Sequence, residues 1–256
     1  MKRAVRFFLW VGIGTLSLVP WAFAQNVTLT SAGSNVYDGV YVSPYYATVN
    51  GATNTPIVCD DFSDDSHLNT SWTGNIQSFS SLSSSLASTA WGSVPNAVTL
   101  YEEAAWLTLT VLQQASGSTG QDYYSYAVWA VFDPGQVLSW LSTHNPDGST
   151  SPDNNACSAI FGASCASVNL SALTSGYLYN AQHNLYSLSE FSNVVLITPL
   201  LANGSTCTAG GCPEQEFIAM VPEGGPAIAY FLLASLCCFG AMFLRSRRQI
   251  ITIPAA

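Results

Sequence analysis

The chain has 256 residues and a formal net charge of −9, and only 8% of its residues are charged although 48% are hydrophobic. All six basic residues lie near the two ends, and all fifteen acidic residues lie within residues 25–225. That region therefore carries a net charge of −15. Proteins neutralise nucleic-acid phosphates with Lys and Arg, so we do not expect nucleic-acid binding. The same absence removes a P-loop lysine, a Schiff-base lysine and an arginine phosphate clamp.

The first 24 residues have the pattern of a secretory signal peptide. Its basic start consists of Lys2, Arg3 and Arg6. An apolar stretch over residues 7–19 follows, and Ala22 and Ala24 form a small-x-small cleavage site. We expect cleavage before Gln25, and the alternative is an uncleaved anchor helix. The remaining exported part is long enough for one sizeable core or two small ones.

The first third of the exported part has strand patterns. Runs rich in β-branched and aromatic residues predict strands over residues 27–34, 40–42, 45–49, 56–59 and 71–79. Residues 37–39 read as a turn, and Asn50-Gly51 is a strong signal for a hairpin. Residues 80–88 are rich in serine and are expected to form a loop or linker.

The periodicity then changes to that of helices. Helices are predicted over residues 100–112, 123–132, 137–141 and 170–185, and strands over 194–198 and 216–221. Asn96 or Thr99 would cap the first helix, Asp133-Pro134-Gly135 would end the second, and residues 145–155 read as a loop. Strands, helices and again strands predict a single exported α+β domain over residues 25–220.

The seven cysteines divide by their surroundings. In an oxidising exterior, Cys157 with Cys165 and Cys207 with Cys212 are natural local disulfides. Other pairings stay open from the sequence, and Cys59 is left over as an odd thiol. The remaining two, at positions 237 and 238, lie in an apolar stretch and are most simply small apolar residues.

The C-terminal region has the pattern of a membrane anchor. Residues 226–244 carry no charge and as a helix would span roughly 28 Å, close to the thickness of a hydrocarbon core. A basic cluster follows, formed by Arg245, Arg247 and Arg248. Such a cluster tends to stay on the cytoplasmic side. We therefore predict one transmembrane helix and a short tail over residues 249–256, the alternative being a buried core helix.

This end of the chain resembles the PEP-CTERM sorting signal of exported bacterial proteins. Val221, Pro222 and Glu223 match the family's Val-Pro-Glu-Pro box, and the apolar helix and basic cluster follow in the family's order up to residue 248. The match departs at Gly224, where the family usually has a second proline. The resemblance implies recognition by an exosortase, a membrane transpeptidase, with delivery to the cell surface or to the exopolysaccharide matrix of a biofilm.

A cluster of acidic residues directly follows Cys59. Its carboxylates belong to Asp60, Asp61, Asp64 and Asp65, with His67 close behind. Because the exported part has no Lys or Arg, a hard ion such as calcium could gather these oxygens. The spacing does not match an EF-hand loop, and solvated loop carboxylates are the alternative.

The surroundings of Cys59 also look like those in surface adhesin domains that contain an internal Cys–Gln thioester. In that family a Gln lies two residues before the Ala of an Ala-Ile-Trp run. The corresponding run here is Ala127-Val128-Trp129, and Ser125 occupies the position of the Gln. The crosslinking partner is therefore missing, and we expect Cys59 to be a buried thiol or part of a rearranged disulfide set.

Hydrolytic motifs are absent from the exported part, which has neither a G-x-S-x-G elbow nor an H-E-x-x-H helix. His144 and His183 read as surface or hydrogen-bonding residues. Glu102-Glu103 could be a carboxylate pair for glycoside hydrolysis, although neighbouring helix residues point in different directions. Several aromatic residues would suit binding to a carbohydrate or protein surface if they are exposed, and the alternative is an ordinary aromatic core. They are Tyr37, Tyr41, Tyr45, Tyr46, Trp72, Tyr123, Tyr124 and Tyr126.

Together these patterns predict an exported, membrane-anchored precursor that is delivered to the cell surface or extracellular matrix. Its expected role is structural or adhesive and non-enzymatic, with an exosortase-like transpeptidase, the membrane and exopolysaccharide as partners. The alternatives are a secreted polysaccharide hydrolase and a calcium-dependent adhesin.

Overall fold

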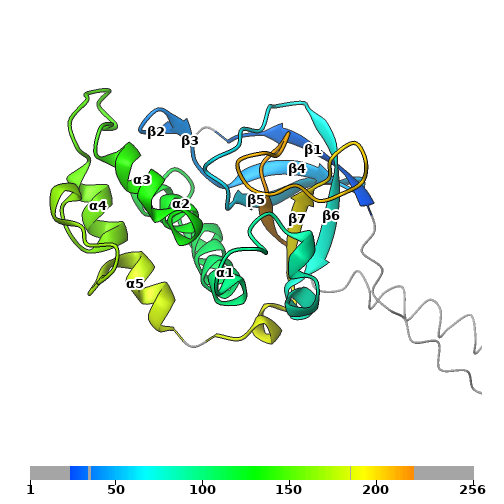
Figure 1. Cartoon of the computed structure of the whole chain (residues 1–256). Helices are drawn as coiled ribbons and strands as arrows, with labels where there is room; N and C mark the ends of the chain where they lie inside the picture. The colour runs from blue at the N-terminus through cyan, green and yellow to red at the C-terminus, as the bar shows by residue number, and fades with distance from the viewer. Residues whose placement is uncertain (1–23, 34–35, 185, 222–256) are drawn as a thin grey trace, which may run out of the picture.

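A computed structural model describes residues 24–33, 36–184 and 186–221 of the chain. This part combines a closed β-barrel with a layer of helices on one side of it (Figure 1). The α+β class predicted from the sequence is therefore confirmed. Among the described residues, no helix has the length and apolar character needed to cross a membrane. Residues 1–23 of the predicted signal peptide, the sorting box beyond Val221, the transmembrane helix and the tail lie outside the described residues, whereas Ala24 is the first residue of a strand.

The barrel has six strands, and every neighbouring pair is antiparallel. Its order is β1-β4-β5-β8-β7-β6. The last two strands of the described residues, β7 and β8, lie between β6 and β5 and so close the barrel. Closure leaves no free sheet edge within this barrel. The strands are β1 Ala24–Ser31, β4 Tyr45–Val49, β5 Ala52–Cys59, β6 Ser71–Ser78, β7 Val194–Pro199 and β8 Phe217–Met220.

The predicted hairpin forms between β4 and β5. Asn50 and Gly51 both have positive φ, at 48° and 86°, which is the backbone of the two-residue turn that matches strand twist. A second, short hairpin joins β2 Val36–Tyr37 to β3 Val40–Tyr41 and stands outside the barrel as a two-stranded sheet. Its turn contains the predicted Asp38-Gly39 pair, again with positive φ at both residues.

Two long helices pack against the barrel, and three short ones lie on their far side (Figure 1). The helices are α1 Ala97–Gln113, α2 Thr119–Phe132, α3 Pro134–Leu141, α4 Asn154–Phe161 and α5 Gly176–His183. Side chains cap three of them, because Ser118, Asp133 and Asp153 each accept a hydrogen bond from a first-turn backbone N–H. Asn96 occupies the N-cap position of α1 as predicted, without a side-chain capping bond.

The sequence prediction differs from the structure most clearly in three segments, and β5 and α2 each begin four residues before their predicted starts. Residues 80–88, predicted as a loop, form two 3-10 helices, η1 Phe79–Ser84 and η2 Leu86–Ser88, because Phe79 and Leu82 are fully buried and anchor them. The helix α4 was not predicted, since its polar first residues continue a loop composition. Finally, α5 spans half of the predicted 170–185 segment. Two further 3-10 helices are η3 Cys165–Ser167 and η4 Leu188–Phe191.

Two predicted disulfides are present, Cys157–Cys165 and Cys207–Cys212. They tie α4 to η3 and close a loop between β7 and β8. Structural disulfides persist in oxidising compartments, so both are consistent with an exported protein. Cys59 is a free, fully buried thiol.

Candidate functional site

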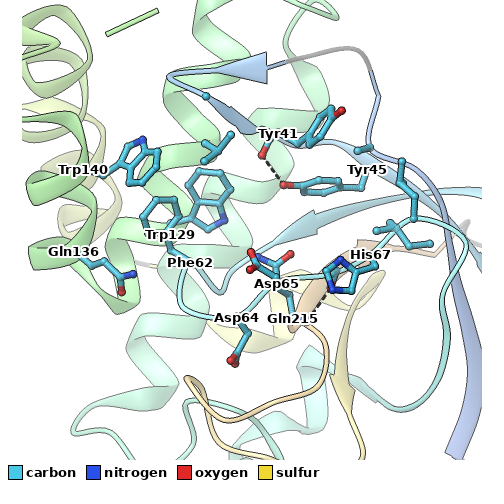
Figure 2. A pocket seen from close by; sticks show the side chains of 16 residues that line it. Tyr41, Tyr45, Phe62, Asp64, Asp65, His67, Trp129, Gln136, Trp140 and Gln215 are labelled. Carbon is cyan, nitrogen blue, oxygen red and sulfur yellow. Dashed lines mark hydrogen bonds between the residues drawn. The ribbon is translucent and has the colours of Figure 1, made fainter. Parts of the chain in front are cut away.

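A cavity of about 610 Å³ opens at the seam between the barrel and the helical layer (Figure 2). Its wall is built by the β2–β3 hairpin, the start of β4, the loop after β5, and helices α2 and α3. This volume is within the usual range for small-molecule sites. The lining residues are Leu29, Ala32, Gly39, Val40, Tyr41, Tyr45, Phe62, Asp64, Asp65, Ser66, His67, Leu68, Trp129, Gln136, Trp140 and Gln215.

Three aromatic rings form the helical side of the pocket (Figure 2). The ring of Phe62 lies 4.9 Å from that of Trp129 on α2 and 5.9 Å from that of Trp140 on α3, measured between centroids. Trp129 is buried, whereas Phe62 and Trp140 are half-buried and reach the cavity. Tilted and edge-to-face contacts of this kind hold each ring in a fixed orientation. His144 stacks on Trp140 at 3.7 Å and fixes it from outside the pocket.

The β2–β3 hairpin supplies the opposite rim and is fastened to the helices. Tyr37 donates a hydrogen bond to the Asp153 carboxylate at 2.7 Å, and the hydroxyl of Tyr126 donates to the Tyr37 carbonyl at 3.1 Å. The hairpin therefore holds Tyr41 at the pocket mouth, where its side chain is 52% exposed. Tyr45 donates to the Tyr41 carbonyl at 2.7 Å and locks this edge to β4 (Figure 2).

The charged residues that line the pocket are carboxylates. Asp64 is held in place because its Oδ2 accepts the backbone N–H groups of Gly210 and Cys212, at 2.9 and 3.3 Å. Asp65 is exposed, and its carboxylate accepts no hydrogen bond from any described residue. With no Lys or Arg between residues 25 and 225, no cationic side chain of this region other than a histidine can neutralise them.

The four aspartates predicted as a calcium site divide between two places. Asp64 and Asp65 are among the residues that line the pocket, although the Asp64 carboxylate is turned toward Gly210 and Cys212 (Figure 2), whereas Asp60 and Asp61 are fully buried. Asp61 Oδ1 accepts the Ser63 N–H at 2.8 Å, and burial nevertheless raises its pKa to about 7. In the described part of the chain, no three His, Cys, Asp or Glu residues are grouped so that they could hold a metal ion. The calcium site stays a prediction.

Asp60 belongs to a buried network around Glu216. The Glu216 carboxylate accepts hydrogen bonds from the Ala90 N–H at 2.9 Å, from the Tyr101 hydroxyl at 2.6 Å and from the Thr198 hydroxyl. Asp60 lies against this carboxylate, and its own oxygens have no hydrogen bond of regular geometry to any described residue. Burial, followed by the charges of Glu216 and Asp61, raises the pKa of Asp60 well above its usual range. Burial and these charges therefore favour the protonated form of Asp60, and three donors hold the Glu216 carboxylate.

Cys59 and Ser125, the residue at the Gln position of the adhesin resemblance, are both hydrogen-bonded to Ser43. The Cys59 backbone N–H donates to Ser43 Oγ at 3.2 Å, and Ser125 Oγ donates to the Ser43 carbonyl at 3.2 Å. Ser43 thus connects Cys59 to Ser125, the residue at that Gln position. Burial and the neighbouring aspartates raise the pKa of the Cys59 thiol well above its usual range, so the nucleophilic thiolate is disfavoured.

Of the residues considered for hydrolysis, Glu102, Glu103 and His183 do not line this cavity, whereas His144 stacks on its lining residue Trp140. Glu102 Oε1 accepts the Leu188 N–H at 3.1 Å, and Glu103 is buried with an unpartnered Oε2. Neither lines the pocket, and His183 is exposed on α5. The sequence named Tyr41, Tyr45 and the aspartates separately. It did not indicate that α2 and α3 bring Trp129 and Trp140 to the same place, since that follows only from helix packing.

A second cavity, of about 680 Å³, lies between β4, β5, the end of β8 and the adjoining ends of α1 and α2. Its lining includes Pro44, Tyr46 and Met220 and contains no charged side chain. We take the first cavity as the candidate site because it alone of the two combines aromatic rings with carboxylates. Comparison of the chain with protein-family models, curated proteins and solved structures finds no match.

Proposed function

We propose that this chain is an exported cell-surface or extracellular-matrix protein with a structural or adhesive, non-enzymatic role. The observation that carries the proposal is the pair of disulfides in a domain without lysine or arginine. Disulfides of this kind are stable outside the reducing cytoplasm. The N-terminal signal and the C-terminal PEP-CTERM-like signal are the sequence features that support export and sorting by an exosortase-like transpeptidase.

The adhesive part of the proposal is supported by the pocket. A preformed cavity lined by aromatic rings and carboxylates is suited to binding a ligand at the surface. The hydrolase alternative is less favoured, because Glu102 and Glu103 are not among the residues that line this cavity. Glycoside hydrolysis would require two carboxyl groups on opposite sides of one scissile bond.

The test of this proposal is cell fractionation combined with intact-mass measurement. The full chain is expressed in cells with and without a sorting transpeptidase. We expect a mature N-terminus at Gln25 in both and, only with the transpeptidase, a C-terminus trimmed near Pro222 and Glu223. Replacing Pro222 and Glu223 by alanine should keep export and abolish the trimming. Untrimmed chain in the cytoplasm with both ends attached would contradict the proposal.

A further inference from the structure

The pocket at the barrel–helix seam has an acidic lining, in which two carboxylates stand beside one histidine, His67. Its carboxylates, Asp64 and Asp65, lie in a region of net charge −15 without Lys or Arg. We propose that this pocket binds an amino sugar that carries a free ammonium group, as a unit of a polysaccharide. This inference rests on the proposed surface role and names the ligand of that role.

The two carboxylates differ in how they can meet the ammonium group. Asp65 is exposed and makes no hydrogen bond to a described residue, so its full accepting capacity is available. Asp64 Oδ2 is occupied by the Gly210 and Cys212 N–H groups, and its carboxylate is turned away from Asp65 (Figure 2), so it contributes negative charge near the pocket. An ammonium group donates three hydrogen bonds, and bonds between charged partners are stronger than neutral ones. Asp65 is therefore the main anchor that we assign.

The aromatic rings provide the surface for the sugar itself. Phe62 and Trp140 present half-buried rings on one side, with the buried ring of Trp129 packed against Phe62, and Tyr41 stands exposed at the mouth on the other (Figure 2). The apolar C–H face of a pyranose can lie on such rings, and a nearby ammonium gains from the negative ring faces. The exposed amide of Gln136 offers both a donor and an acceptor to sugar hydroxyls.

Other ligand classes fit these groups less well. An anionic glycan would bring negative charge to two carboxylates whose neighbourhood contains no Lys or Arg and one histidine, His67. A neutral glycan would use the rings and donate hydroxyl hydrogen bonds to Asp65, but it would bring no positive charge to the carboxylate. A lysine-bearing peptide would satisfy the carboxylates, but its flexible chain presents no flat apolar face to the rings. The amino sugar is the class that offers both an apolar face to the rings and a positive charge to the carboxylates.

The experiment is calorimetric titration of the full chain, purified at pH 6 in a zwitterionic detergent without a sugar head group. The probes are a β-1,4-linked glucosamine tetramer, its N-acetylated form and a galacturonate tetramer. We expect the glucosamine tetramer to bind roughly 10-fold more tightly than the acetylated form, because acetylation removes the charged hydrogen bond. The galacturonate tetramer should give no measurable binding. Equal or tighter binding of the acetylated form would overturn the proposal.

Variants locate the site. Asp65→Asn should remove most of the preference for the free amine, whereas Asp147→Asn, at an exposed carboxylate that does not line the pocket, should leave it unchanged. Trp140→Ala should weaken binding of both tetramers, and Trp106→Ala, whose ring stacks on Tyr186 elsewhere, should not. An unchanged preference in Asp65→Asn would contradict the assigned anchor.

A fourth probe separates sugar recognition from simple attraction to amines. A lysine tetrapeptide should bind more weakly than the glucosamine tetramer, and equal binding would overturn the assignment to an amino sugar. These titrations do not depend on where the protein resides in the cell. A failure of binding therefore leaves the fractionation result standing, and a cytoplasmic location would refute the surface role without changing the titrations.

Discussion

The domain should become more stable as the pH is lowered from 8 to 6. Burial raises the pKa values of Asp38, Asp61 and Glu103 to about 7, and no cationic side chain other than a histidine is available to offset this. In the unfolded chain these groups lose their protons near pH 4. Between pH 4 and 7 the folded state therefore holds more protons than the unfolded state. Stability is greatest at the acidic end of this range and falls as the pH rises through 7.

The size of the effect follows from the same linkage. One carboxyl with a folded pKa of about 7 contributes about 1.4 kcal/mol between pH 8 and pH 6, so three would contribute about 4 kcal/mol at most. Partial hydration reduces these contributions, and we expect about 2 kcal/mol in total. For a domain of this size, this corresponds to a rise in melting temperature of about 4–8 °C.

The assay is thermal unfolding of the full chain in detergent, followed by circular dichroism at constant ionic strength and with the disulfides intact. Glu103→Gln removes one of the three groups and should reduce the pH dependence by about a third. Glu190→Gln alters an exposed carboxylate and should leave it unchanged. A melting temperature that is highest at pH 8, or an unchanged pH dependence in Glu103→Gln, would refute the reasoning.

Two further variants test the packing of the helical layer and the buried network. Gly162→Ala should destabilise the domain by about 3 kcal/mol or more, because the added Cβ would lie 2.1 Å from Ser175 Oγ. Gly148 also has a positive φ but has open space around it, so Gly148→Ala should cost only about 1 kcal/mol. Chemical denaturation should separate the two, and equal losses would contradict the steric argument. Tyr101→Phe removes a buried donor to a carboxylate and should cost about 1.5–3 kcal/mol, against less than about 0.5 kcal/mol for Tyr177→Phe. A loss no larger than that of Tyr177→Phe would show that the bond does not stabilise the fold.

The strands and the long helices could be predicted because each has a local cause. Asn50-Gly51 specifies its turn through positive φ, and Asp133-Pro134 both ends α2 and starts α3. The closure of the barrel could not be predicted, since the pairing of β8 with β5 joins residues near position 218 to residues near position 58. No periodicity within either strand encodes its partner. The same limit applies to α4, which depends on the Asp153 cap and on burial of Ile160.

The candidate site was only partly visible in the sequence for a related reason. The aspartates after Cys59 form one acidic run in the chain, which suggested one site. In the structure, the strand end directs Asp60 inward and the following loop carries Asp65 to the surface. Where a chain leaves a strand, residues only a few positions apart can therefore range from fully buried to exposed. Whether these carboxylates form one site depends on the direction in which the chain leaves the strand, and the composition does not reveal that direction.

The absence of lysine and arginine gives these two groups of carboxylates opposite roles. Inside the domain, where charge is costly, carboxyls are neutralised by protons or held by hydroxyl and backbone donors, as Asp60 and Glu216 are. At the pocket, Asp65 stays in water and needs no internal partner. A lysine placed nearby would pair with it and weaken binding of an external ammonium group. The lack of cations that makes the interior dependent on pH is therefore also what keeps the pocket carboxylate available to a ligand.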